Sequence, residues 1–153
     1  MGSPNVIPSF YGIFLSNFAN CPHGLILPET FCGIDDRTYP SVEHAFQAAK
    51  TFDLRKRDAM IHGTAAQAKR LGRSLRLRPD WEKIKEDVML DLLRQKYRVE
   101  PFRSLLLRTG SAELIEGNRH GNTYWGVCEG VGKNRLGYLT MQVRSELERE
   151  GLV

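Results

Sequence analysis

Cysteine is scarce in this sequence. The three cysteines, Cys21, Cys32 and Cys128, are odd in number and widely spaced. They do not read as the disulfide framework of a small secreted domain, so we expect reduced thiols. No apolar run approaches the roughly 20 residues of a membrane-spanning helix, and the N-terminus lacks the pattern of a signal peptide. We therefore expect a cytoplasmic protein without a membrane partner.

Familiar ligand-binding motifs are also missing. The four histidines are scattered and no Cys-x-x-Cys pair occurs, which argues against a metal site. No Gly-x-Ser-x-Gly elbow indicates a serine hydrolase, and the glycine spacing over 130–137 matches neither a P-loop nor a Rossmann fingerprint. The sequence predicts no metal and no cofactor, although a glycine-rich loop before a helix suits an anion.

The bulk composition is that of one globular domain. The chain has 153 residues, of which 41% are hydrophobic and 26% are charged. No repeat, low-complexity tract or linker divides it. We predict one domain over 11–153, preceded by residues 1–10 as a flexible start or a remnant of cloning.

Positive charge is concentrated in one segment. Between Leu54 and Pro79 the sequence has eight Lys or Arg residues and a single acid, Asp58. Phosphates are the commonest partners of such a segment, in a nucleotide or along a nucleic acid. A solvated surface without a partner is the alternative. The eight residues of this basic segment are Arg55, Lys56, Arg57, Lys69, Arg70, Arg73, Arg76 and Arg78.

The residue pattern predicts an α+β fold that is predominantly helical, with a small β element near the N-terminus. The predicted strands are 13–18, 25–31 and 37–39, the last two flanking a turn at 33–36. The predicted helices are 41–51, 65–71, 80–97, a short one after Pro101, and 136–148. Between Gly110 and Gly137, repeated glycines interrupt every periodicity and indicate loops that can bind a ligand.

The helix predicted from Ser41 carries three polar side chains on one side. At about 100° per residue, Glu43, Gln47 and Lys50 fall within an arc of roughly 60°, next to the apolar stripe. A carboxylate, an amide and an amine in this setting can protonate a leaving base, hold a sugar and supply a nucleophile. The alternative is a surface helix with a mixed polar edge.

Lys50 can act as a nucleophile only if burial lowers its pKa from the usual value of about 10.4. The neutral amine would then attack a sugar carbon, or the aldehyde of an opened ring, and form an imine. Most lysines are instead solvated charges, and the helix alone does not decide between the two roles.

The loop over 116–126 combines amides and aromatic rings with glycines. Rings can stack on a base, and amides can bind its edge or the hydroxyls of ribose. Burial of Trp125 in the core is the alternative. We predict that this loop closes a pocket opposite Glu43, Gln47 and Lys50.

Six strings, in order along the chain, resemble the successive motifs of the NADAR family. The strings are FLSNF at 14–18, YPSVEHAFQAAK at 39–50, AKRLGR at 68–73, DW at 80–81, YWGV at 124–127 and NRLG at 134–137. The resemblance implies a compact α+β domain that binds an ADP-ribose-like or nucleotide ligand. It also implies an N-glycosidase, which breaks a bond between a ribose carbon and a nitrogen.

The resemblance further implies roles for single residues. Glu43 matches the catalytic acid and base, Lys50 matches the lysine that reacts with ribose, and Trp81 matches a ring beside the substrate. The other implied substrate-binding residues are Asn17, Phe18, His44, Gln47, Arg73, Tyr124, Trp125, Gly126, Asn134 and Gly137.

Asn122 departs from the family pattern, which tends to have Asp before the Tyr-Trp-Gly string. An amide keeps the shape of this side chain but lacks the negative charge that would stabilise a cationic transition state. Asn122 is therefore a candidate catalytic position in a chain of reduced activity, whether the residue is natural or engineered.

Three functions follow as alternatives. The first is removal of ADP-ribose from a modified guanine in single-stranded DNA, through a Lys50 imine and proton transfer by Glu43; the basic segment and the string at 121–128 favour it. Its partners would be the ADP-ribose moiety and the ADP-ribosylated strand. The second is an N-glycosidase of phosphorylated intermediates of riboflavin biosynthesis. The third is a module that binds ADP-ribose or a nucleotide without cleaving it.

Overall fold

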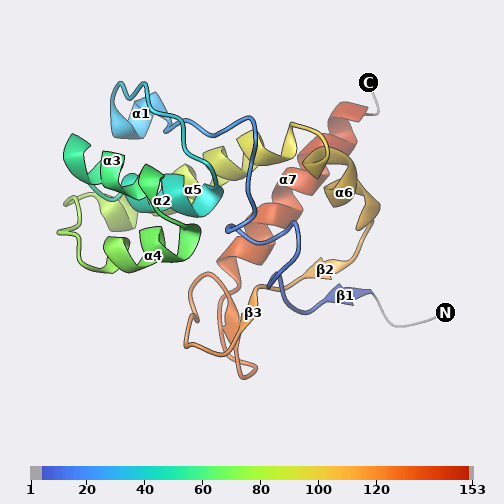
Figure 1. Ribbon diagram of the computed structural model, residues 1–153. Coiled ribbons are helices and arrows are strands. Elements are labelled where there is room, and N and C mark those ends of the chain that lie inside the picture. Colours follow the sequence, from blue (N-terminus) through green and yellow to red (C-terminus); the bar gives the residue numbers. More distant parts are fainter. Residues whose placement is uncertain (1–4, 152–153) are drawn as a thin grey trace. The chain divides into compact units, whose positions relative to one another are not determined.

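The computed structural model describes residues 5–151, and most of its regular elements are helices (Figure 1). The helices are α1 (Glu29–Cys32), α2 (Val42–Ala48), α3 (Leu54–His62), α4 (Ala65–Arg73), α5 (Trp81–Tyr97), α6 (Phe102–Arg108) and α7 (Arg135–Gly151). The strands are β1 (Val6–Ile7), β2 (Glu113–Leu114), β3 (Gly117–Asn118) and β4 (Val127–Cys128). These elements confirm the predicted fold class, α+β and predominantly helical.

The chain forms two compact units. The helical unit comprises residues 17–96 and contains α1 to α4 and nearly all of α5. The terminal unit comprises residues 5–16 and 97–151, with all four strands, α6 and α7. The prediction of one domain over 11–153 stays a prediction.

Helix α2 is the buried centre of the helical unit. All seven of its residues are buried, and it packs against α3 and α4 (Figure 1). The Ser41 hydroxyl accepts a hydrogen bond from the His44 amide and so caps the helix, as predicted. Because α2 is surrounded, its polar side chains lie inside the unit, and the alternative of an ordinary surface helix is wrong.

Capping residues also define the helices around α2. The Asp53 side chain accepts hydrogen bonds from two amides at the start of α3. At the start of α4, Thr64 and Gln67 form a capping box, in which each side chain bonds to the backbone of the other residue. The predicted helices at 65–71 and 80–97 are confirmed as α4 and α5.

The predicted N-terminal strands are wrong. Residues 13–18 form turns. The amide of Ile13 donates to the carbonyl of Phe10, and the amide of Ser16 donates to the carbonyl of Ile13. Of the hairpin predicted at 25–39, only one antiparallel bridge forms, between Leu25 and Tyr39. Pro28 caps the start of α1, which lies inside the predicted strand. The Pro28 carbonyl accepts a helical hydrogen bond from the amide of Cys32.

The basic segment is not a continuous surface patch. Arg57 is 1% exposed and Arg78 is 6% exposed. Arg57 donates to the carboxylate of Asp35 at 3.0 Å and to two backbone carbonyls. Arg78 donates to Asp80 at 2.7 Å and to the carbonyl of Ala49 at 3.3 Å. Both guanidinium groups therefore hold the helical unit together instead of meeting solvent.

The terminal unit joins both ends of the chain. β1 pairs in parallel with β2, and β3 pairs in parallel with β4. α7 contacts β2 and α6. Phe10 is completely buried. Residues 1–4 of the predicted flexible start lie outside the described residues, whereas Val6–Ile7 is paired and Phe10 is packed. The flexible start over 1–10 stays a prediction.

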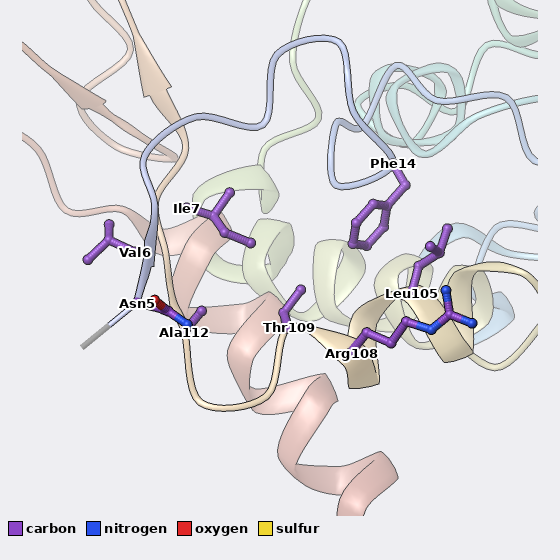
Figure 2. A pocket seen from close by; sticks show the side chains of 8 residues that line it. All are labelled: Asn5, Val6, Ile7, Phe14, Leu105, Arg108, Thr109 and Ala112. Atoms are coloured by element: carbon purple, nitrogen blue, oxygen red, sulfur yellow. The ribbon is translucent and has the colours of Figure 1, made fainter. Parts of the chain in front are cut away.

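A cavity of about 410 Å³ lies within the terminal unit (Figure 2). Its lining includes Ile7 and Val6 of β1, Phe14, and Thr109 after α6. Figure 2 shows Ile7 turned toward Thr109 and Phe14, whereas Val6 points to the other side of its strand. None of the predicted site residues lines this cavity.

Within residues 5–151, no helix is long and apolar enough to cross a membrane.

Candidate active site

Glu43 and Gln47 form a buried pair on α2. The Gln47 amide nitrogen donates to the Glu43 carboxylate at 2.6 Å. Glu43 is 8% exposed and Gln47 is 5% exposed. The four-residue spacing brings both side chains to the same side of the helix, as predicted.

Burial raises the pKa of the Glu43 carboxyl above its usual range, because loss of water penalises the charged form. The hydrogen bond from Gln47 opposes this rise, as do the positive charges of Lys69 and Lys50. The raised pKa favours a protonated carboxyl, which is the form that a general acid needs.

Lys50 lies just beyond the end of α2 and not within it. Its amide donates to the carbonyl of Gln47 at 3.2 Å, and its own carbonyl accepts from the amide of Arg78 at 3.0 Å. The lysine Nζ lies 5.8 Å from the centre of the Phe46 ring. Backbone contacts on both sides thus hold Lys50 beside an aromatic side chain.

Burial lowers the pKa of Lys50, again because the charged form loses water. The positive charges of Arg73, Lys69 and Lys85 lower it further, while the negative charge of Glu43 raises it. Lys50 is therefore not an ordinary solvated charge. A lowered pKa increases the share of neutral amine, which is the nucleophilic form.

Trp81 and Phe46 form an apolar wall. Their ring centroids are 5.0 Å apart with the planes tilted by 56°, and both side chains are buried. Since Phe46 lies beneath the Lys50 ammonium, the wall contributes to the desolvation of that lysine. A role of Trp81 against a substrate stays a prediction.

Asn17 is attached to the start of α2. Its carbonyl accepts the amide of Glu43 at 3.0 Å, and its side-chain nitrogen donates to the sulfur of Met89 at 3.6 Å. The side-chain oxygen is buried without a hydrogen-bond partner. Buried acceptors are rarely left unsatisfied, so this oxygen is an unusual feature of the helical unit. A contact of Asn17 with a substrate stays a prediction.

His44 has a structural role that the sequence did not reveal. Its Nε2 donates to the carbonyl of Gly63 at 2.8 Å, so Nδ1 accepts from the hydroxyl of Ser41 at 2.6 Å. Both ring nitrogens therefore have partners within the helical unit, and a contact of His44 with a substrate stays a prediction. The ring ties α2 to the start of α4.

Phe18 and Arg73 are more accessible than the other predicted residues of the helical unit. Phe18 is 43% exposed, and the Nζ of Lys69 lies 5.9 Å from the centre of its ring. Arg73 is exposed in the last turn of α4. Both positions are open to a ligand, and their contact with one stays a prediction.

Asn122 shapes the loop of the terminal unit through its side chain. Its side-chain oxygen accepts from the amide of Trp125 at 3.1 Å, and its own amide donates to the side-chain oxygen of Asn118 at 3.0 Å. The Asn118 amide nitrogen bonds back to the carbonyl of Asn122 at 2.9 Å. Sequence reasoning missed Asn118, although an amide residue next to a glycine is a typical turn residue.

Tyr124 and Trp125 form an edge-to-face pair in this loop. Their ring centroids are 4.9 Å apart at 79°, and the Nζ of Lys133 lies 5.4 Å from the centre of the Tyr124 ring. Trp125 is only half-buried. Complete burial of Trp125 in the core, the alternative to a binding role, is therefore wrong.

Asn134 uses both ends of its side chain within the terminal unit. Its oxygen accepts from the amide of Glu116 and its nitrogen donates to the carbonyl of Leu114, both at 2.9 Å. A side chain at Gly126 would meet the carbonyl of Glu116 at 2.1 Å, and one at Gly137 would meet that of Leu114 at 2.2 Å. These three residues hold the loop against its neighbours, and a contact with substrate stays a prediction.

The predicted site residues thus fall into two groups. Glu43, Gln47, Lys50, Asn17 and Trp81 belong to the helical unit, and the residues from Asn122 to Gly137 belong to the terminal unit. A pocket shared by the two groups stays a prediction.

Across residues 5–151, no three His, Cys, Asp or Glu side chains come together in a way that could hold a metal ion.

Known proteins resemble this chain along most of its length. N-glycosidase YbiA of Escherichia coli strain K12 is 41% identical over 145 residues, which cover 92% of this chain and 84% of that protein. Riboflavin biosynthesis protein VVA0006 of Vibrio vulnificus is 36% identical over 140 residues, covering 88% of this chain and 35% of that protein. The chloroplastic riboflavin biosynthesis protein PYRR of Zea mays is 34% identical, covering 90% of this chain and 23% of that protein.

A solved structure and a family model agree with these relatives. The NMR structure of the E. coli protein YbiA matches with a TM-score of 0.77 and 36% identity, and the match covers 99% of this chain and 90% of that one. The model of the NADAR domain matches residues 10–148, which include parts of both units. The predicted resemblance is confirmed, and this chain belongs to the NADAR domain family.

Proposed function

We propose that this chain is an N-glycosidase that hydrolyses the bond between a ribose carbon and the nitrogen of a base. The observation that carries the proposal is the buried pair of Glu43 and Gln47 next to Lys50, with the pKa of each ionisable group shifted toward its reactive form. The name of the E. coli relative, N-glycosidase YbiA, supports the same class of reaction.

The first half of the reaction transfers the sugar to Lys50. The ribose ring opens at C1′, the neutral Nζ of Lys50 adds to C1′, and the proton that Nζ loses passes to the former ring oxygen. Glu43 donates its carboxyl proton to the base nitrogen, the bond from C1′ to this nitrogen breaks, and the base leaves. C1′ is then joined to Nζ as a protonated imine.

Water completes the reaction. Its oxygen adds to C1′ of the imine, and the Glu43 carboxylate takes one of its protons. The bond between C1′ and Nζ then breaks as the remaining hydroxyl proton moves to Nζ, which releases the sugar as an aldehyde. Glu43 and Lys50 regain their starting protonation states, and the net change consumes one molecule of water.

ADP-ribosylated guanine in single-stranded DNA is the substrate that we propose for this chemistry. Without the buried Arg57 and Arg78, six cations of the basic segment remain, and five of them are exposed. Exposed cations on and after α3 and α4 suit the phosphates of a strand or of ADP-ribose. The five exposed cations are Arg55, Lys56, Arg70, Arg73 and Arg76.

A phosphorylated intermediate of riboflavin biosynthesis is the second candidate substrate. The names of the relatives from Vibrio vulnificus and Zea mays favour it, because both are called riboflavin biosynthesis proteins. The chain covers only 35% and 23% of these proteins, so their names describe much more than the matched domain. The chemistry at Glu43 and Lys50 would be the same for either substrate.

Reduction with borohydride tests the imine. A protein mixed with ADP-ribosylated oligonucleotide and borohydride should become covalently linked to the sugar through Lys50. Lys50→Ala should abolish both the linkage and turnover, whereas Lys83→Ala, which changes an exposed lysine of α5, should keep both. Trapping that persists in Lys50→Ala would rule out the proposed nucleophile.

A comparison of substrates tests which ligand is correct. The rate of base release is measured side by side for an ADP-ribosylated oligonucleotide and for a phosphorylated aminopyrimidine riboside. Faster cleavage of the small molecule would favour the riboflavin pathway. Binding of ADP-ribose is measured by calorimetry for this chain and for Asn122→Asp. If both proteins bind ADP-ribose and neither releases a base from either substrate, the chain is a binding module.

A further inference from the structure

We propose that Gly72 is a positioning residue for Glu43. Because Gly72 has no side chain, α4 can lie directly against the Gln47 amide, which is thereby held on the Glu43 carboxylate. The inference rests on the proposed function only where it concerns catalysis. The contact itself can be tested without a substrate.

The close approach of α4 to Gln47 is explicit in the geometry. A Cβ placed on Gly72 would lie 1.8 Å from the side-chain oxygen of Gln47 and 2.6 Å from its amide carbon. Real Cβ atoms essentially never come this close to another heavy atom, so even alanine would push the amide away. The end of a glutamine side chain is flexible, and displacement of Gln47 is therefore the first response to a methyl group at Gly72.

The orientation of the Gln47 amide explains why this contact matters. Its nitrogen donates to Glu43 at 2.6 Å, which directs its oxygen away from the carboxylate. That oxygen is buried without a hydrogen-bond partner. An unsatisfied buried acceptor costs stability. The Gln47 amide nevertheless keeps its oxygen on the side of Gly72, because this orientation places the amide nitrogen on the Glu43 carboxylate.

Helix α4 is anchored at its start. His44 of α2 donates to the carbonyl of Gly63, and the capping box of Thr64 and Gln67 defines the first turn of α4 from there. A helix held at this end cannot easily move away to make room at Gly72. A larger residue at Gly72 therefore acts on Gln47 before it acts on the helix.

Displacement of Gln47 has a defined electrostatic consequence. The hydrogen bond from Gln47 lowers the pKa of Glu43 against the rise caused by burial. The ionisable groups that act on Glu43 are Lys69 of α4, Lys50 after α2 and, in its protonated form, His44 within α2, and each of these positive charges also lowers the pKa of Glu43. Loss of the amide leaves these charges in place, so the pKa of Glu43 should rise.

A cycle of variants tests the proposal by NMR titration of the Glu43 carboxyl carbon. In Gly72→Ala and in Gln47→Ala, we expect its pKa to rise by about one unit, since a hydrogen bond to a charged group contributes about the free energy of one pKa unit. In the double variant we expect the same rise and no more, because the methyl group then has no amide to displace. Gly151→Ala, at a helical glycine with open space around it, should leave the pKa unchanged.

The double variant also keeps the test open if Gly72→Ala does not fold. Removal of the Gln47 side chain relieves the contact, so the double variant should melt at a higher temperature than Gly72→Ala. Additive pKa shifts, or an unchanged pKa of Glu43 in Gly72→Ala, would overturn the proposal. A double variant that melts no higher than Gly72→Ala would overturn it as well.

Activity then separates the positioning role from the proposed function. If Glu43 is the general acid, the rate falls as pH rises through its pKa, and this limb should move to higher pH in Gly72→Ala. Glu43→Gln should lose activity in the same assay. If Glu43→Gln keeps the full rate while the NMR shifts are found, the proposed function fails and the contact between Gly72 and Gln47 stands.

Discussion

Glu43 connects activity with stability at the level of a single residue. Its pKa is raised by burial, so the folded state holds a proton that the unfolded chain releases at lower pH. As pH rises from the ordinary pKa of 4.5 through the folded value, the native state binds more protons than the unfolded state. The free energy of unfolding therefore falls with pH over this window.

Glu43→Gln should stabilise the protein above this window while it removes activity. Glutamine carries no charge that must be buried, so the gain in melting temperature should be larger at about pH 8 than at about pH 4. Loss of a general acid should slow turnover by about 10²- to 10⁴-fold. Thermal unfolding at the two pH values, together with a product assay, measures both effects. An equal change in melting temperature at both pH values would contradict a raised pKa for Glu43.

Asn122→Asp should increase activity and keep the loop intact. A carboxylate oxygen can accept the amide of Trp125 as the present side-chain oxygen does. It adds a negative charge that would stabilise a cationic transition state if the loop lines the site. Asn122→Ala is the control, since it removes the acceptor and should lower the free energy of unfolding by about 1 kcal/mol. Product assays measure the rates of the three proteins, and urea unfolding measures their stabilities. If Asn122→Asp is no faster than the present chain, a carboxylate at position 122 has no catalytic role.

Single residues were predictable where sequence spacing determines contact. Glu43 and Gln47 are four residues apart in one helix, so their pairing followed from helical geometry. The roles of Gly72 and Arg57 depend on which helices pack together. Neither contact has a local signature, because the residues concerned are 25 and 22 positions apart in the chain.

At the scale of elements, long periodic helices were predictable and short pieces were not. The helix predicted at 136–148 is confirmed within α7, where apolar residues recur every three or four positions. Helix α3 was missed because it is dominated by charged residues, and only Arg57 and Met60 are buried in it. The segments 25–31 and 37–39 on either side of a turn suggested strands, but a proline and tertiary contacts of α1 produced a short helix.

Arg57→Ala should damage the helical unit far more than Arg55→Ala, although both residues lie in α3. Arg57 is buried and bonds to Asp35 and to two carbonyls, and its loss would leave a buried carboxylate without this cation. Removal of one partner from a buried ion pair costs about 3–5 kcal/mol, whereas an exposed substitution changes stability by about 0.5 kcal/mol or less. Urea unfolding of both variants provides the measurement. Equal loss of stability would mean that the buried contact is not structural.

At the scale of the whole molecule, charge is the property most relevant to the choice of substrate. The formal net charge is +4, and five exposed cations of the basic segment lie on or after α3 and α4. A single nucleotide presents a few phosphates near the reacting sugar, whereas a DNA strand presents one for every nucleotide. The two candidate substrates therefore differ most in how many of these cations they would engage.

Salt dependence should reveal which substrate engages the basic segment. For a single strand, the logarithm of affinity falls with that of salt concentration by about 0.7 for each phosphate neutralised. The same slope can be measured as the logarithm of kcat/KM against the logarithm of salt concentration. If DNA is the substrate, Arg70→Gln combined with Arg76→Gln should make this slope less steep by about 1.4, because two phosphate contacts are lost. Cleavage of a small phosphorylated riboside should change little, since its phosphates do not extend along the segment.

Arg149→Gln is the matched control for these two arginines, because it removes an exposed arginine of α7 outside the basic segment. It should leave the salt slope unchanged with either substrate. If the paired variant and the control give the same slope on DNA, Arg70 and Arg76 do not contact a strand. The excess of positive charge would then be a solvated surface, and the riboflavin intermediate would become the better candidate, because it needs no extended contact with phosphates.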